Sequence, residues 1–109
     1  LKNTVIRQSK QDYLVFDVKN SKRIAETFSK RGAIAYAHAI AKNKPNRLDE
    51  ILELDMKLGK HYMDSLFAKN TIEKSKDDAR TDSAMVRFDI AKDHTWHYIS
   101  QLDEYIFDD

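Results

Sequence analysis

The sequence of 109 residues contains no cysteine, one proline, two glycines and one tryptophan. Without cysteine the chain forms neither a disulfide bond nor a thiolate metal site, and so little proline and glycine excludes collagen-like and Gly/Pro-rich disordered chains. It also lacks an apolar run near the ~20 residues of a membrane-spanning helix, and no signal-peptide pattern opens it. We therefore expect one folded domain over residues 1–109, in a reducing, cytoplasmic compartment and without a membrane partner.

The net charge of +1 hides an uneven distribution of charge along the chain. Residues 1–47 carry eleven Lys and Arg against three acidic residues, a net charge of +8. Residues 48–109 carry eight Lys and Arg against fifteen acidic residues, a net charge of −7. A basic half joined to an acidic half favours self-complementary packing first and an anionic partner second.

The first thirty residues have the pattern of a small antiparallel sheet. Residues 13–18 and 24–28 are rich in β-branched and aromatic side chains, and the segment between them has turn composition. Residues 4–7 supply a possible third strand. We predict a β-hairpin or a three-stranded meander over this part of the chain.

The register of the hairpin follows from its apolar residues. Pairing Val18 with Ile24 and Leu14 with Phe28 gathers these side chains and Phe16 on the buried face, and it implies a bulge. A register shifted by one residue would bury three smaller or more polar side chains instead, namely Arg23, Ala25 and Thr27.

Helical patterns occupy the rest of the chain. Ser29 is a candidate N-cap for an alanine-rich helix over 30–42, which is slim enough to approach a neighbour closely. After Pro45, Asn46 is expected to cap a second helix, and the polar residues 74–82 are expected to form the turn before a third. We predict an α+β fold in which residues 1–44 form a basic hairpin plus helix, and residues 45–109 form an acidic, long antiparallel helical hairpin.

The last helix carries apolar residues at heptad spacing, starting at Ala84. Such a spacing serves a helical hairpin or a seam between two copies of the chain equally well. Met85 and Trp96 lie off this row, together on one side, where they would cover the sheet or form a second contact patch. The residues assigned to an oligomer seam are Phe88, Ala91, Tyr98, Leu102 and Tyr105.

Asp55 is the most unusual polar residue, because it lies at the centre of the apolar face of its helix. A buried carboxylate requires a partner, and the expected one is a hydrogen bond to Tyr98, Thr95, His38 or a backbone amide at a helix N-terminus. The alternative is a catalytic or ligand-holding carboxylate. Gly59, one turn further, would let another element approach closely.

Two further groups suggest metal binding. His94 and His97 are three residues apart beside Asp93, and antiparallel pairing would bring His61 to the same level, so that these four residues could bind zinc or another transition metal. They match no specific zinc motif. We expect no cofactor.

Asp49, Glu50 and Glu53 are spaced like the magnesium-binding E-E-x-x-E helix of the dimeric all-α nucleotide pyrophosphatases, which the segment resembles over five residues. That resemblance implies a metal-dependent nucleotide hydrolase. The E-x-x-D segment that follows in those enzymes is missing, because Glu73 and Asp77 are four residues apart, as are Asp89 and Asp93.

The basic half suggests nucleic-acid binding, because a hairpin can enter a groove and cations at a helix start suit phosphates. Tyr13, Phe16 and Phe28 are interleaved with these cations. The candidate residues are Lys10, Lys19, Lys22, Arg23, Lys30 and Arg31.

Taken together, the patterns favour a small non-enzymatic assembly protein that forms homodimers or larger oligomers through its C-terminal helices. A nucleic-acid-binding protein is the first alternative, and a nucleotide hydrolase is the second. The strand–turn–strand–helix opening looks like that of many small bacterial and phage proteins, and this resemblance implies no activity.

Overall fold

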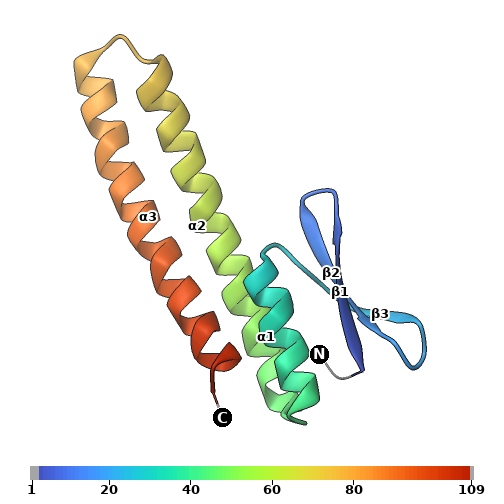
Figure 1. The fold of residues 1–109 in the computed structure, drawn as a ribbon. Helices are drawn as coiled ribbons and strands as arrows, with labels where there is room; N and C mark the ends of the chain where they lie inside the picture. Colours follow the sequence, from blue (N-terminus) through green and yellow to red (C-terminus); the bar gives the residue numbers. More distant parts are fainter. Residues whose placement is uncertain (1–2, 109) are drawn as a thin grey trace.

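The computed structural model of the chain describes residues 3–108 and has the expected α+β architecture (Figure 1). Three antiparallel strands in the spatial order β1-β2-β3 precede the helices, so the three-stranded form of the prediction is confirmed. The elements are β1 (Thr4–Ser9), β2 (Asp12–Asp17), β3 (Lys22–Thr27), α1 (Lys30–Ala41), the 3-10 turn η1 (Pro45–Arg47), α2 (Leu48–Lys74) and α3 (Asp78–Ile106).

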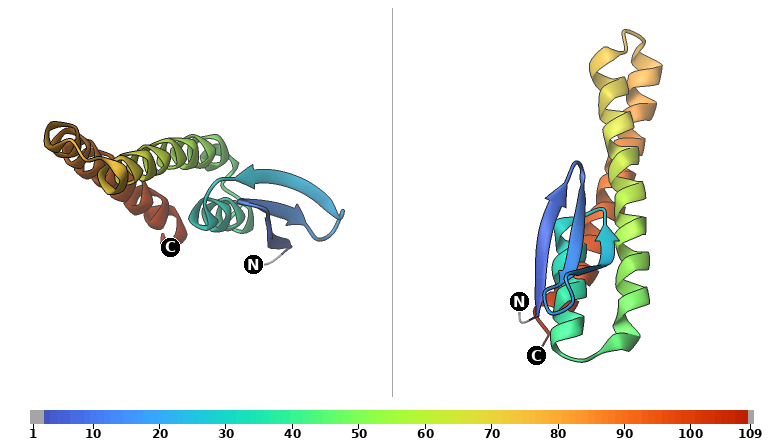
Figure 2. Two further views of the ribbon diagram at one scale, coloured as in Figure 1. Left: turned by 90° about the horizontal axis from the view of Figure 1, so that it is seen from above. Right: turned by 90° about the vertical axis from the view of Figure 1, so that its right-hand side faces the viewer.

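Helix α1 lies between the sheet and the hairpin of α2 and α3 (Figures 1 and 2). It can be covered on both sides because its buried residues are small, and close approach of two elements needs small side chains. Its only large, fully covered side chain is that of Tyr36. The small buried residues are Gly32, Ala33, Ala35, Ala37 and Ala39.

The face of the sheet that packs against α1 is not the one that we expected but the opposite one. Val15 is fully buried and pairs with Ala25, whereas Leu14 pairs with Glu26 and faces away from α1. A bulge is present, as predicted, but it lies where Val15 is followed by Phe16, whose partner is Arg23. The register that pairs Val18 with Ile24 is therefore wrong.

The small side chains of α1 explain this reversal. An alanine surface is covered best by a sheet that also offers small and β-branched side chains, because the backbones can then approach closely. Val15, Ala25 and Thr27 supply such side chains, and Thr27 is almost fully buried, while the larger Ile6 and Tyr13 of the same face also pack against the core. The larger Leu14 and Phe16 remain on the outer face, only half-buried.

The helix termini agree with the sequence in part. The Ser29 hydroxyl accepts a hydrogen bond from the Gly32 amide, as expected for an N-cap. Asn46 lies within η1 and does not cap α2, which begins without a side-chain cap. The turn before α3 is only three residues long, because the Asp77 carboxylate caps α3 and the next polar residues form its solvated first turn.

The hairpin extends well beyond the rest of the molecule. The molecule measures 56 × 28 × 17 Å, and its radius of gyration is 16.8 Å. A compact chain of this length has a radius of about 13 Å. The excess comes from the outer part of α2 and α3, residues 60–96, which neither α1 nor the sheet accompanies and which we call the arm (Figures 1 and 2). Within residues 3–108, no helix combines the length and the apolar character that crossing a membrane requires.

Candidate functional site

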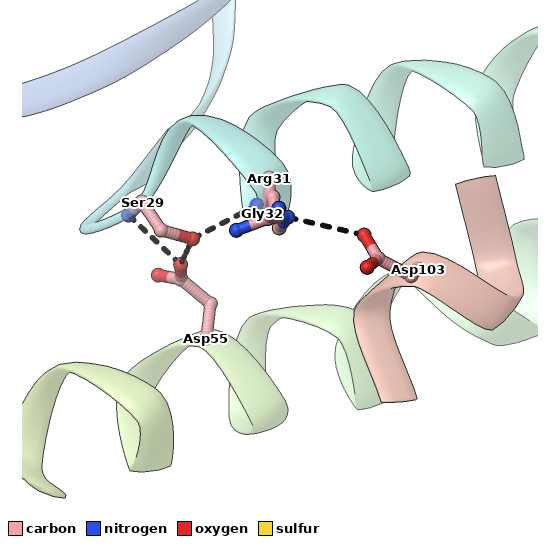
Figure 3. Close-up of polar contacts among 5 residues, drawn as sticks. All are labelled: Ser29, Arg31, Gly32, Asp55 and Asp103. Atoms are coloured by element: carbon pink, nitrogen blue, oxygen red, sulfur yellow. Dashed lines mark hydrogen bonds and ion pairs between the residues drawn. The ribbon is translucent and has the colours of Figure 1, made fainter. Parts of the chain in front are cut away.

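Asp55 links α2 to the start of α1 (Figure 3). It is 4% exposed, and both of its carboxylate oxygens accept hydrogen bonds. The Phe28 amide donates to Oδ2 at 2.7 Å, while the Ser29 amide and hydroxyl donate to Oδ1 at 2.9 and 2.6 Å. The partner is therefore the backbone at a helix N-terminus, one of the expected possibilities, and the carboxylate satisfies donors that α1 itself leaves free.

The two glycines of the chain make this approach possible. A Cβ atom at Gly32 would overlap the Asp55 carboxylate, and one at Gly59 would overlap the Phe28 ring. Gly59 thus lets another element approach α2, as we expected from its position. Because its hydrogen bonds are all made within the fold, Asp55 acts as a structural residue here.

The histidines of the predicted metal site are only partly brought together. The rings of His61 and His94 stack with their centroids 4.6 Å apart, and His61 also stacks on Tyr98 at 5.6 Å. His97 instead contacts the edge of Tyr98. Among residues 3–108, no three His, Asp or Glu side chains gather closely enough to hold a metal ion, so His61, Asp93, His94 and His97 do not form the expected site.

His61 and His94 lie in a groove of about 530 Å³ between α2 and α3 on the arm. Asp64 and Arg87 also line this groove. Burial lowers the pKa of His61, and the neighbouring His94 lowers it further, because a second positive charge on the stack is unfavourable. The pair is a pH-sensitive contact between the two helices.

The acidic side chains at the start of α2 do not gather, within residues 3–108, into a group that could hold a metal ion. Glu53 pairs with Lys57 at 3.1 Å. Burial and, after it, the neighbouring Glu50 carboxylate raise the pKa of Tyr105 to about 12. Asp49 is exposed in the first turn of α2, where the helix dipole stabilises a carboxylate.

The six candidate cations for nucleic-acid binding do not form one patch. Lys10 lies in the β1–β2 turn, whereas Lys19, Lys22 and Arg23 surround the β2–β3 turn at the other end of the strands, about 20 Å away for strands of six residues. Lys30 and Arg31 begin α1. Arg31 is paired with Asp103 of α3 at 3.1 Å.

The heptad row of α3 is used largely within the chain. Leu102 is fully buried, and Ala91 nearly so. Tyr98 and Tyr105 are half-buried, and both pack against the core. A contact between copies through these residues would require the hairpin to open. Phe88 is the one member of the predicted seam that lies on the arm and is still half-exposed.

A second apolar surface remains uncovered on the arm. Gly59 and Tyr62 face Phe28, the residue that leads into α1, and Tyr62 lies 5.9 Å from its ring. Residues four positions further along α2 lie on the same side of the helix. On α3, Thr95 and Ile99 line a hollow with Phe28, and other α3 residues share their side by helical spacing. We call this surface the distal face: Tyr62, Met63, Leu66, Met85, Phe88 and Trp96.

The sequence indicated two of the six residues of the distal face as a separate contact patch. Met85 and Trp96 stood out because they lie off the heptad row, and both are exposed. Tyr62 and Leu66 continue the apolar spacing of α2, so the sequence alone gives no sign that they are exposed. The structure shows that α1 begins level with Tyr62. The apolar residues of α2 beyond that level are therefore not covered by α1.

No protein-family model, curated protein or solved structure matches this chain. The chain's own surfaces therefore carry the functional argument, and the distal face is one that presents exposed apolar side chains from both helices of the arm.

Proposed function

We propose that the protein assembles with itself, as an isologous dimer in which the arms of two copies pack antiparallel through their distal faces. The observation that carries this proposal is the exposed apolar surface of the arm. Its five most exposed side chains are between 39% and 57% exposed, namely Tyr62, Met63, Leu66, Met85 and Trp96. Contiguous exposure of this kind marks an interaction surface.

The sheet, α1 and the parts of α2 and α3 beside them, which we call the base, support the same conclusion. In the base, α1 packs against α2 and α3 and completes a three-helix core. Beyond Tyr62 the two helices continue without a third element (Figure 1). Two arms laid side by side would supply the missing cover for one another and form a four-helix bundle.

The available area is sufficient for a stable dimer. Half-exposed aromatic and Met side chains each contribute about 100 Å² of removable surface, so the distal face offers roughly 600 Å² per copy. A standard interface buries about 800 Å² per partner, including its polar rim. The distal face would thus form the apolar centre of an interface of ordinary size.

Charge selects a second copy as the occupant. Residues 60–96 contain seven basic and seven acidic side chains, so the arm carries no net charge. Two neutral arms approach without net repulsion, and both signs are present for rim contacts in an antiparallel pair. A strongly charged partner would gain no comparable attraction from this surface.

The first test measures the molar mass in solution by light scattering and sedimentation across a wide range of protein concentration. We expect a dimer for the wild type and monomers for Leu66→Glu and Met85→Glu. Each charge placed in the apolar centre should raise the dissociation constant at least about thirtyfold, or about 2 kcal/mol. Val86→Glu is the matched control, because Val86 is as exposed as Met85 but points to another side of α3.

Cross-linking provides a second readout, because the chain has no native cysteine. In an antiparallel isologous pair the twofold axis passes near the middle of the arm, so Leu66→Cys should form a disulfide-linked dimer on mild oxidation, whereas Val86→Cys should not. A wild type that stays monomeric at all concentrations would overturn the proposal. So would Val86→Glu dissociating the dimer as completely as Leu66→Glu.

A further inference from the structure

The outer face of the sheet is a second surface that the fold leaves open. α1 covers only the inner face, and no other element formed by residues 3–108 lies across the outer one (Figure 2). The register places two rows of side chains there, each drawn from all three strands. The outer face consists of Val5, Phe16 and Arg23 in one row and of Arg7, Leu14 and Glu26 in the other.

A shallow hollow of about 370 Å³ lies at the β2–β3 end of this face. Phe16 lines it, together with the exposed side chains of Val5 and Val18. Arg7 borders the same hollow. An aromatic ring beside aliphatic side chains in an open hollow offers a flat apolar surface for a planar group.

The cations around this hollow are not neutralised by the fold. Arg7, Lys19, Lys22 and Arg23 form no ion pair with any residue between 3 and 108. Asp17 also borders the hollow, but its carboxylate accepts hydrogen bonds from the Lys19 amide and the Asn20 side chain within the turn.

Other cations of the basic half are paired inside the molecule. Arg31 pairs with Asp103, and Lys44 and Arg47 both pair with Asp108. Within residues 3–108, Lys10, Lys30 and Lys42 are likewise unpaired but lie at the β1–β2 turn and at the two ends of α1. Four unpaired cations belong to the strands and the β2–β3 turn around the hollow.

We propose that the outer face of the sheet binds single-stranded nucleic acid, with one base stacked on Phe16 and phosphates held by Arg7, Arg23 and the lysines of the β2–β3 turn. A planar base and a phosphate backbone match an aromatic surface surrounded by cations. A single strand is favoured over a duplex because its bases are free to stack on a side chain, whereas those of a duplex stack on each other.

The test measures the fluorescence anisotropy of a labelled oligothymidylate as the protein is added at low salt. We expect binding that weakens as salt is added, and a dissociation constant about tenfold higher for Phe16→Ala. Phe16 is half-buried outside the core, so this variant keeps its fold. Phe107→Ala is the matched control, because Phe107 is exposed at the opposite end of the chain.

Charge is tested separately. Replacing Arg7 and Arg23 by Gln should reduce the magnitude of the negative slope of log K against log salt by about one. Arg80→Gln on the arm should leave the slope unchanged. The monomeric Leu66→Glu protein should retain the Phe16-dependent binding, which separates this proposal from the proposed self-assembly.

Three results would overturn the proposal. The first is the absence of binding at low salt. The second is an equal effect of Phe16→Ala and Phe107→Ala. The third is binding of a DNA duplex or of polyglutamate as tight as that of the single strand, which would identify a general surface for polyanions or acidic proteins.

Discussion

At the scale of single residues, Asp55 shows how one polar side chain positions a helix. Its carboxylate accepts hydrogen bonds from the amides of Phe28 and Ser29, the two residues that precede α1, so it fixes where α1 starts relative to α2. Gly32 gives it room, and Ser29 connects its oxygen to the Gly32 amide. The sequence predicted a partnered carboxylate at this position because an unpaired one would be too costly. It did not specify which amides, because the contact joins residues 26 and 27 positions apart.

We predict that Asp55→Ala lowers the free energy of unfolding by about 3 kcal/mol, because three partly buried donors lose their acceptor. Gly32→Ala should lower it by about 2 kcal/mol through overlap with the same carboxylate. In the double variant the two losses should not add, since the overlap disappears with the carboxylate. Urea denaturation measures all three, with the exposed Asp49→Ala as control. Additive losses would show that the two residues act independently.

At the scale of elements, α2 and α3 show why a heptad pattern does not identify its partner. The row from Ala84 to Leu102 is regular enough for a seam between copies, yet Leu102 and Ala91 are buried within the chain. Any long helical hairpin needs such a row to hold its own helices together. A contact between copies must therefore use residues beside that row, as the distal face does.

We predict that the contact of the stacked histidines between α2 and α3 depends on pH. The pKa of His61 is lowered in the folded protein, so the unfolded chain takes up the proton more readily. Stability is then complete above the ordinary pKa of about 6.5 and falls as the pH is lowered through it. We expect a less steep fall between about pH 7 and pH 5 in His61→Gln.

Titration of the imidazole signals by NMR tests the cause directly. In His94→Gln the pKa of His61 should rise, because one positive neighbour is removed. It should stay below the ordinary value, because burial is the larger cause of the shift. An unchanged pKa would show that the two rings are not electrostatically coupled.

At the scale of the whole molecule, a three-layered base supports a two-helix arm. The ion pairs that join the basic and acidic halves all lie in the base, between Arg31 and Asp103 and around Asp108. The opposite net charges of the halves are thus partly satisfied within one copy, as self-complementary packing requires. The arm is neutral and is held by the apolar contact between its two helices.

Hydrogen exchange should reveal this division. Amides of the arm should exchange faster than those of α1 and of the first three turns of α2, because fewer buried contacts oppose local opening. In a dimer the arm gains cover, so we expect its protection to fall in Leu66→Glu while protection of the base stays unchanged. Equal protection of arm and base in that monomeric variant would contradict the prediction.

The sequence alone determined the order and type of the elements, the Ser29 cap, the close approach at Gly59 and the burial of Asp55. These follow from local spacing and from the cost of burying unpartnered polar groups. Tertiary structure decided which face of the sheet is buried, because small residues on α1 select small residues opposite them. It also decided from which residue on the apolar surface of α2 is exposed, because that depends on where α1 begins beside it. Both proposed interaction surfaces therefore lie where one element ends or leaves a face open, which no local pattern records.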